Sequence, residues 1–155
     1  MNTIEKKIIA EMHILFAKAK ERKYLADEKT LNEIIKKNYD LDYISITEFY
    51  IISYIGKEEK VNGIKLSEKI GMTRGGISKA ISSLIKKELI ISYKDDKNKK
   101  KIYYKLTPLG KIIYEIHKCK NEERNKQIIN KISQYNEQEK DVIIKFIKDM
   151  QSFLM

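Results

Sequence analysis

Basic side chains are concentrated in one short stretch of this chain. Between Thr73 and Lys105 there are ten lysines and arginines but only three acidic residues, a net charge of +7 out of a total of +10. Like charges at such density repel one another unless an anion lies beside them. A polyanion with regularly spaced phosphates, such as nucleic acid, would provide that compensation. The charge distribution therefore favours a nucleic-acid partner.

The densest part of this stretch is the segment from Asp95 to Lys101, which has four lysines in its last five positions. We predict that it forms the loop of a hairpin whose strands are Leu89–Lys94 and Ile102–Leu106, both rich in β-branched and aromatic residues. Such a loop can lie along a phosphate backbone or enter a minor groove. The alternative is a flexible, solvated loop, which is the common fate of a charge run.

The segment from Thr73 to Glu88 is predicted to be a helix with two contrasting faces. At about 100° per residue, the side chains of Ile77, Ile81, Leu84 and Ile85 fall in one apolar sector. The opposite face is small and polar, with Gly75, Lys79, Ser82, Ser83 and Lys86, flanked by Gly76 and Ser78. Small residues let a helix lie deep in a major groove, where hydroxyls and lysines reach base edges and phosphates. Amides at Arg74–Gly76 present a positive helix end.

Two consecutive glycines in the first turn of a helix cost roughly 1 kcal/mol each relative to alanine. Close approach of another molecule would explain Gly75 and Gly76. An ordinary exposed helix is the alternative explanation. Because a basic hairpin follows this helix directly in sequence, we favour nucleic acid.

Residues suited to catalysis or to metal binding are few. His13 and His117 are the only histidines, and Cys119 is the only cysteine. His117 and Cys119 are two residues apart and do not share a helix face, and no neighbouring ligands complete a metal site. We find no phosphate-cradling glycine motif and no nucleophile with its base. We therefore expect no enzyme, no cofactor and no metal, with His13, His117 and Cys119 as ordinary surface or interface residues.

The surrounding pattern predicts a mainly α-helical protein. Apolar residues recur every three or four positions in several segments, and the helix 66–70 is separated from the helix 73–88 by a Gly-Met turn, which is typical of a helix-turn-helix. The order of elements is that of a winged helix, with a small antiparallel wing of two or three strands. The predicted helices span residues 3–24, 27–37, 46–57, 66–70, 73–88, 107 to about 132 and 137–153.

Length and composition place these elements in one unit. A chain of 155 residues with 42% hydrophobic residues is long and apolar enough for one domain with a real core. No apolar run approaches the length of a membrane span, and the amino terminus has no secretory pattern. A single cysteine fits a reducing compartment. We expect a cytoplasmic, nucleoid-associated protein that does not bind membranes.

Helices at both ends of the chain carry apolar stripes that a small DNA-binding core does not need. We expect them to bury these stripes against a second copy of the chain. The expected division is a dimerisation region at 1–40 and 107–155, and a DNA-binding lobe at 46–106.

The chain resembles the MarR family of bacterial transcriptional regulators over roughly Ile46 to Ile116. The resemblance is carried by Ile46-Thr47-Glu48-Phe49, by Leu66-Ser67-Glu68-Lys69-Ile70-Gly71-Met72-Thr73-Arg74-Gly75-Gly76-Ile77-Ser78-Lys79, and by Leu106-Thr107-Pro108-Leu109-Gly110 after the wing. It implies a homodimeric winged-helix protein, a repressor by family habit, that binds a pseudo-palindromic operator in double-stranded DNA.

Together with the polar helix face and the basic loop, the resemblance defines a set of expected DNA contacts. In the family, an Asp and an Arg near the wing tip cooperate in the minor groove. Here Asn98 and Lys100 stand at those positions, and lysine lacks the planar fork of arginine. With 29 lysines and 3 arginines in the chain, codon bias alone can account for this change. The expected contacts are Thr73, Arg74, Gly75, Gly76, Ser78, Lys79, Ser82, Ser83, Lys86, Lys97, Asn98, Lys99, Lys100 and Lys101.

The resemblance also implies a small aromatic effector, for which Tyr39, Tyr43, Phe49 and Tyr50 are candidate lining residues; aromatic side chains at this spacing are more often core. Two other functions remain open. One is an architectural or RNA-associated winged helix without sequence preference. The other is a protein–protein adaptor whose basic wing docks an acidic partner. The identities of the effector and of the target genes do not follow from the sequence.

Overall fold

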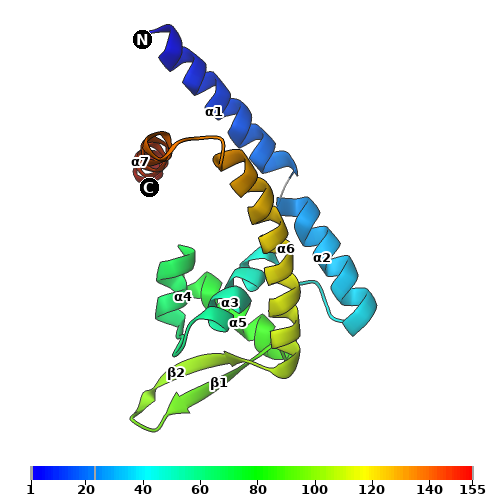
Figure 1. Ribbon diagram of the computed structural model, residues 1–155. Coiled ribbons are helices and arrows are strands. Elements are labelled where there is room, and N and C mark those ends of the chain that lie inside the picture. Colours follow the sequence, from blue (N-terminus) through cyan, green and yellow to red (C-terminus); the bar gives the residue numbers. More distant parts are fainter. Residues whose placement is uncertain (1, 23, 155) are drawn as a thin grey trace. The chain divides into compact units, whose positions relative to one another are not determined.

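The computed structural model describes residues 2–22 and 24–154, and the side chains among them other than those at 19–27 and 154. Its contacts divide the chain into two units, Met1–His117 and Lys118–Met155, so the boundary lies within a long helix. The elements are α1 (Thr3–Arg22), α2 (Tyr24–Tyr39), α3 (Ile46–Lys57), α4 (Gly63–Ile70), α5 (Arg74–Lys86), β1 (Ile90–Asp95), β2 (Asn98–Leu106), α6 (Pro108–Ile132) and α7 (Glu137–Leu154) (Figure 1).

The hydrophobic core of the first unit is centred on α3. Ser45 caps this helix in a capping box, in which its hydroxyl accepts from the Glu48 amide and the Glu48 carboxylate accepts from the Ser45 amide. Phe49, Ile52 and Ile55 form the inward stripe of α3 and are buried. Further core residues come from α2, α4, α5, the wing and the start of α6: Leu31, Ile35, Leu66, Ile77, Ile81, Leu84, Leu89, Ile90 and Ile113.

The predicted helix-turn-helix is present as α4 and α5. Gly71 ends α4 with φ of 71°, a left-handed conformation that glycine adopts without strain. The Ser67 hydroxyl donates to the Met72 carbonyl at 2.6 Å and closes the turn. Two predictions were inexact: α4 begins at Gly63 rather than at Leu66, because Asn62 caps it, and Ile85 is 41% exposed instead of buried. Ile85 lies at the edge of the apolar sector, beyond the reach of the core.

The wing is a two-stranded antiparallel hairpin that projects from the helical part of its unit (Figure 1). Tyr104 also forms a single antiparallel bridge to Val61, in which the Tyr104 amide donates to the Val61 carbonyl. Val61 thus acts as a minimal third strand. The predicted seven-residue loop is wrong, because only Asp96 and Lys97 form the turn. The register moves from Lys94–Ile102 to Asp95–Asn98, so the three lysines at 99–101 form a bulge within β2. An exposed ribbon needs no apolar alternation, so its strands extend further than the pattern indicated.

Thr107 and Pro108 begin α6 as predicted. The Thr107 hydroxyl accepts from the Gly110 amide and donates to the Glu88 carbonyl, which joins this helix start to the end of α5. A Cβ atom added at Gly110 would lie 1.9 Å from the carbonyl oxygen of Leu89. Only glycine therefore permits this packing of helix against backbone.

Several helix faces that we expect to be buried against a second copy are exposed in the single chain. They belong to the later part of α6 and to α7, where Ile128, Ile129, Ile132, Phe146 and Ile147 each expose at least 40% of their surface. Ile112 at the start of α6 is exposed as well. The described part of α1 is similar, with an apolar strip of Ile4, Ile8, Ile14, Leu15 and Phe16 open to solvent. Among the described residues, no helix is long and apolar enough to cross a membrane.

Candidate nucleic-acid interface

A groove of about 550 Å³ lies between α4, α5 and the wing. One flank of α5, with Arg74 and Ser78, and the strand β2 thus border the same concave surface. Its floor is apolar, formed by Ile77 and Ile81. The residues around the groove are Asn62, Gly63, Ile64, Lys65, Arg74, Ile77, Ser78, Ile81, Lys100, Lys101, Ile102 and Tyr104.

The charged side chains around this groove are all positive. They are Lys65 from α4, Arg74 from α5, and Lys100 and Lys101 from the wing. Four cations around one hollow, with no carboxylate among the lining residues, produce a local positive potential suited to phosphates. The sequence did not predict Asn62 and Lys65 here, because α4 was expected to start after them. Asn62 before a helical stretch was the available cap signal.

The predicted outward face of α5 is exposed, with two exceptions. Ser83 is half-buried, and its hydroxyl hydrogen-bonds Glu48 on α3 rather than pointing to the groove. Gly76 is also half-buried. The remaining predicted contacts on this segment are exposed: Thr73, Arg74, Gly75, Ser78, Lys79, Ser82 and Lys86.

The two glycines at the start of α5 have different surroundings. Thr73 caps the helix by accepting from the Gly76 amide at 3.2 Å, so the positive helix end consists mainly of the amides at 74 and 75. A Cβ at Gly76 would approach the Met72 methyl group at 3.1 Å and the Thr73 hydroxyl at 3.3 Å. A Cβ at Gly75 would meet nothing within 4 Å. Packing within the chain therefore accounts for Gly76 but not for Gly75.

Backbone hydrogen bonds shape the tip of the wing. The Asp95 carboxylate accepts from the Lys97 amide, and the Asn98 side chain accepts from the Lys100 amide. Asn98 thus braces the bulge, while the side chains of Lys97 to Lys101 extend into solvent. These contacts fix the backbone conformation of the segment that carries the wing lysines.

An ion pair connects the tip of the wing to the segment before α4. Lys60 Nζ lies 2.9 Å from Asp95 Oδ2. The hydrogen bond from Lys60, followed by that from the Lys97 amide, lowers the pKa of Asp95, and the same pairing raises the pKa of Lys60. An exposed ion pair adds little to the stability of the fold. We therefore infer that this pair serves to orient the wing.

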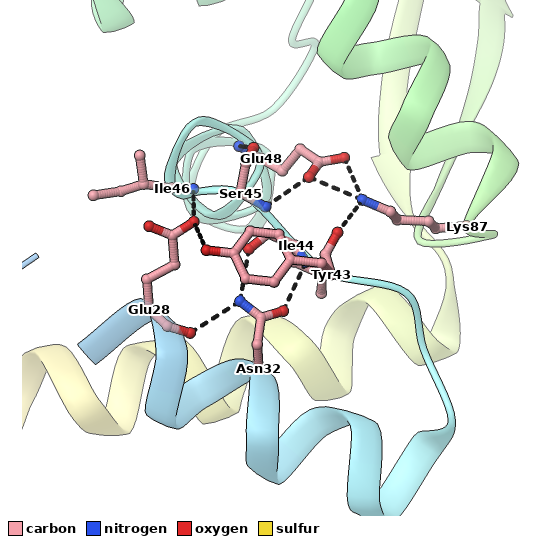
Figure 2. Close-up of polar contacts among 8 residues, drawn as sticks. All are labelled: Glu28, Asn32, Tyr43, Ile44, Ser45, Ile46, Glu48 and Lys87. Atoms are coloured by element: carbon pink, nitrogen blue, oxygen red, sulfur yellow. Dashed lines mark hydrogen bonds and ion pairs between the residues drawn. The ribbon is translucent and has the colours of Figure 1, made fainter. Parts of the chain in front are cut away.

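A buried polar cluster lies at the C-terminal end of α5 (Figure 2). None of its residues lines the groove. Lys87 Nζ donates to both carboxylate oxygens of Glu48, at 2.8 and 2.9 Å, and to the Tyr43 carbonyl at 2.6 Å. Burial raises the pKa of Glu48, but hydrogen bonds from Lys87, the Ser45 backbone and Ser83, with the charge of Lys87, outweigh it and lower this pKa overall. The sequence did not predict this cluster.

The cluster continues from Tyr43 to α2. Glu28 Oε1 accepts from the Tyr43 hydroxyl at 2.6 Å and from the Ile46 amide at 3.1 Å. The hydrogen bond to the Glu28 carboxylate, with smaller effects of burial and charge, raises the pKa of Tyr43 to about 12. Asn32 bonds both the amide and the carbonyl of Ile44. The segment 43–46 is thus held from α2 on one side and from α5 on the other.

His13, His117 and Cys119 are not among the residues that line the groove. His13 and Cys119 are exposed. His117 is buried, with Nδ1 2.9 Å from the Ser53 hydroxyl and its ring stacked on Phe49. Within residues 2–22 and 24–154, no group of three His, Cys, Asp or Glu side chains is arranged to hold a metal ion.

The four aromatic residues considered for an effector pocket differ in burial within the single chain. Phe49 is a core residue, whereas Tyr39, Tyr43 and Tyr50 are exposed.

Comparisons with known proteins agree with this architecture. Residues 47–122 match the family described as winged helix DNA-binding domain. Over 158 residues the chain is 25% identical to the HTH-type transcriptional regulator PchR of Bacillus subtilis, covering 99% of this chain and 92% of PchR.

Two solved structures have a similar fold. FabT of Streptococcus pneumoniae, solved in complex with DNA, has a TM-score of 0.70 at 22% identity, over 97% of this chain and 96% of FabT. A MarR/EmrR family transcriptional regulator of Acinetobacter sp. ADP1 has a TM-score of 0.64 at 21% identity, over 99% and 98% of the two chains.

Proposed function

We propose that this chain, whose residues 47–122 match a winged helix DNA-binding domain and whose fold is that of MarR-family structures, is a transcriptional regulator. It binds an operator in double-stranded DNA as a homodimer and represses transcription. The observation that carries the proposal is the groove bordered by α5 and the wing, whose charged lining residues are all positive. In this arrangement α5 would lie in the major groove of DNA, and the wing would contact the flanking phosphate backbone.

We assign different tasks to the helix and to the wing. Arg74, Ser78, Lys79 and Ser82 lie on the exposed side of α5, and hydroxyls and amines there can hydrogen-bond base edges. The wing lysines at 97 and 99–101 bind phosphates, which adds affinity without sequence preference. Asn98 contributes by shaping the bulge. Lys65 adds a phosphate contact from α4.

The proposed dimer uses the terminal helices. The exposed strip on α1 includes Ile4 and Leu15, and on α7 Phe153 is 80% exposed. Burying these apolar side chains between two copies would stabilise the dimer by about 25 cal/mol for each Å² removed from water. A twofold pair presents two α5 helices to successive major grooves, so the operator should be an inverted repeat with half-sites about one helical turn apart.

A small aromatic effector that alters the separation of the two α5 helices is part of the proposal, with its binding site unassigned. The place of action is the cytoplasm, where the chromosome lies. The proposal gives the chain no catalytic role and no cofactor.

Selection of genomic fragments on the immobilised protein tests the central claim. We expect the bound fragments to share an inverted repeat. Bound fragments without a common sequence would instead indicate an architectural or RNA-associated protein, and failure to retard any DNA at physiological salt would indicate an adaptor.

Two substitutions then separate the assigned tasks. Lys79→Ala should weaken binding to the operator by roughly tenfold, the loss of one base contact, with a smaller effect on random DNA. Lys100→Ala should weaken binding to both and reduce the salt slope by about one unit. Lys36→Ala on α2 is the matched control and should change neither. Equal losses on both DNAs for Lys79→Ala would contradict its role in base recognition.

A further inference from the structure

The C-terminal end of α5 is held by one side chain that reaches across to α3. Lys87 follows the last residue of the helix, and its ammonium group donates to three oxygens, two from Glu48 and one from Tyr43. The side chains of Lys87 and Glu48 are only 12% and 5% exposed. A lysine in this place also faces the negative end of the helix dipole, which favours a cation.

These contacts join parts of the chain that are distant in sequence. Lys87 and Glu48 are 39 residues apart, and Lys87 and Tyr43 are 44 apart. Through Tyr43 the cluster continues to Glu28 on α2, so α2, α3 and α5 meet at one polar joint (Figure 2). In the described part of the chain, no buried side-chain nitrogen or oxygen lacks a hydrogen-bond partner. A fully paired buried network tolerates only a narrow range of geometries.

The opposite end of α5 is the one that faces the groove, with Arg74 and Ser78. A helix of 13 residues is about 20 Å long. A tilt of about 5° at its C-terminal end therefore moves the other end by about 1.7 Å. Hydrogen bonds to base edges tolerate a change of only about 0.5 Å in the donor–acceptor distance. The attraction between lysines and phosphates, in contrast, falls off slowly with distance. A small tilt thus reduces sequence recognition before it reduces general affinity for DNA.

We propose that Lys87 is a positioning residue for operator recognition, which sets the tilt of α5 by anchoring its C-terminal end to Glu48 and to the Tyr43 carbonyl. The inference rests on the proposed function, because it concerns how the same helix meets DNA. It separates Lys87 from its neighbour Lys86, which is exposed and is available for a phosphate contact.

The comparison of Lys87→Met with Lys86→Met tests this assignment on full-length protein. Methionine keeps most of the aliphatic stem and removes the ammonium group. Affinities for the selected operator and for random DNA of equal length are measured by fluorescence anisotropy, at a temperature where thermal unfolding shows each variant to be folded. Lys87→Met should lower operator affinity about tenfold, the loss of one or two base contacts, and random-DNA affinity less than twofold. Lys86→Met should lower both by a similar factor.

A conservative variant separates positioning from general damage. Lys87→Arg retains a cation that can bond Glu48 and the Tyr43 carbonyl, so its ratio of operator to random-DNA affinity should stay within about threefold of wild type. A ratio as low as that of Lys87→Met would overturn the proposal, because the ammonium contacts would not be the cause. An unchanged ratio in Lys87→Met would overturn it as well.

A second substitution keeps the test decisive if Lys87→Met does not fold. Glu48→Gln retains an oxygen for the Ser45 amide and for Lys87 but removes the charge, and it should lower the same ratio at least threefold. No change in the ratio would contradict the proposed anchor. Wild-type protein that prefers no sequence at all would refute the proposed function itself, before any variant is compared.

Discussion

Gly75→Ala should make the free protein more stable and the DNA complex weaker. Gly75 is the second residue of α5, and a Cβ there would meet nothing within 4 Å. Replacing an unconstrained helical glycine by alanine stabilises a protein by about 0.5–1 kcal/mol, partly by restricting the unfolded chain. For a chain of this size that corresponds to a rise in Tm of about 2 °C.

The expected loss of DNA affinity comes from the added methyl group. If the backbone of α5 lies against DNA at Gly75, a methyl group must push the two surfaces apart and lengthen the neighbouring hydrogen bonds. Losing one such contact on each protomer weakens operator binding by at least about tenfold. Differential scanning calorimetry gives the stability, and fluorescence anisotropy on operator and random DNA gives the affinity.

Gly76→Ala is the matched control for this experiment. Its Cβ would crowd the Met72 methyl group and the Thr73 hydroxyl, so it should gain no stability despite the same change in helix propensity. Opposite signs for stability and affinity in Gly75→Ala would support close approach of DNA. A variant that is more stable and binds DNA as tightly as wild type would refute the reasoning about Gly75.

Two further predictions concern the stability of the fold. Gly110→Ala should destabilise the protein by about 3 kcal/mol in urea unfolding, because its Cβ would clash with the Leu89 carbonyl. Gly63→Ala, at a helical glycine with open space around its Cβ, should leave stability unchanged or raise it slightly; equal losses in the two variants would contradict the packing argument. Glu48 has a lowered pKa in the folded protein, so its contribution to stability is present above its ordinary value of 4.5 and is lost as the pH falls through the folded-state pKa. The difference in unfolding free energy between wild type and Glu48→Gln should therefore shrink from pH 5 to pH 3, and a constant difference would indicate that the charge of Glu48 is not involved.

Local signals in the sequence were sufficient for the order of elements and for most of their limits. α3 has the predicted bounds, and α5 starts one residue after the predicted Thr73, which caps it. Gly71 and Pro108 mark the end and the start of helices because their backbone preferences act within a few residues. The adjacency of α5 and the basic hairpin in the chain follows from the sequence, and residues of both line one groove; their joint contact with DNA stays a prediction.

Contacts between distant segments were beyond the reach of pattern analysis. Ser83 has the right spacing for the outer face of α5, yet it hydrogen-bonds Glu48 on another helix. Lys86 and Lys87 are neighbouring residues of the same type. Of the two, Lys87 bonds an acidic side chain 39 residues away, Glu48. The wing lysines predicted as a loop form a bulged strand, because pairing with β1 extends further than apolar alternation indicated.

The amino-acid sequence alone determined the kind of molecule, because caps, glycines, apolar spacing and charge act over a few neighbouring residues. It also determined the basic character of the surface that we propose binds DNA. The tertiary structure decided which cations face the groove and which one anchors a helix from within, because burial and pairing depend on side chains that folding brings together from α2, α3 and α5.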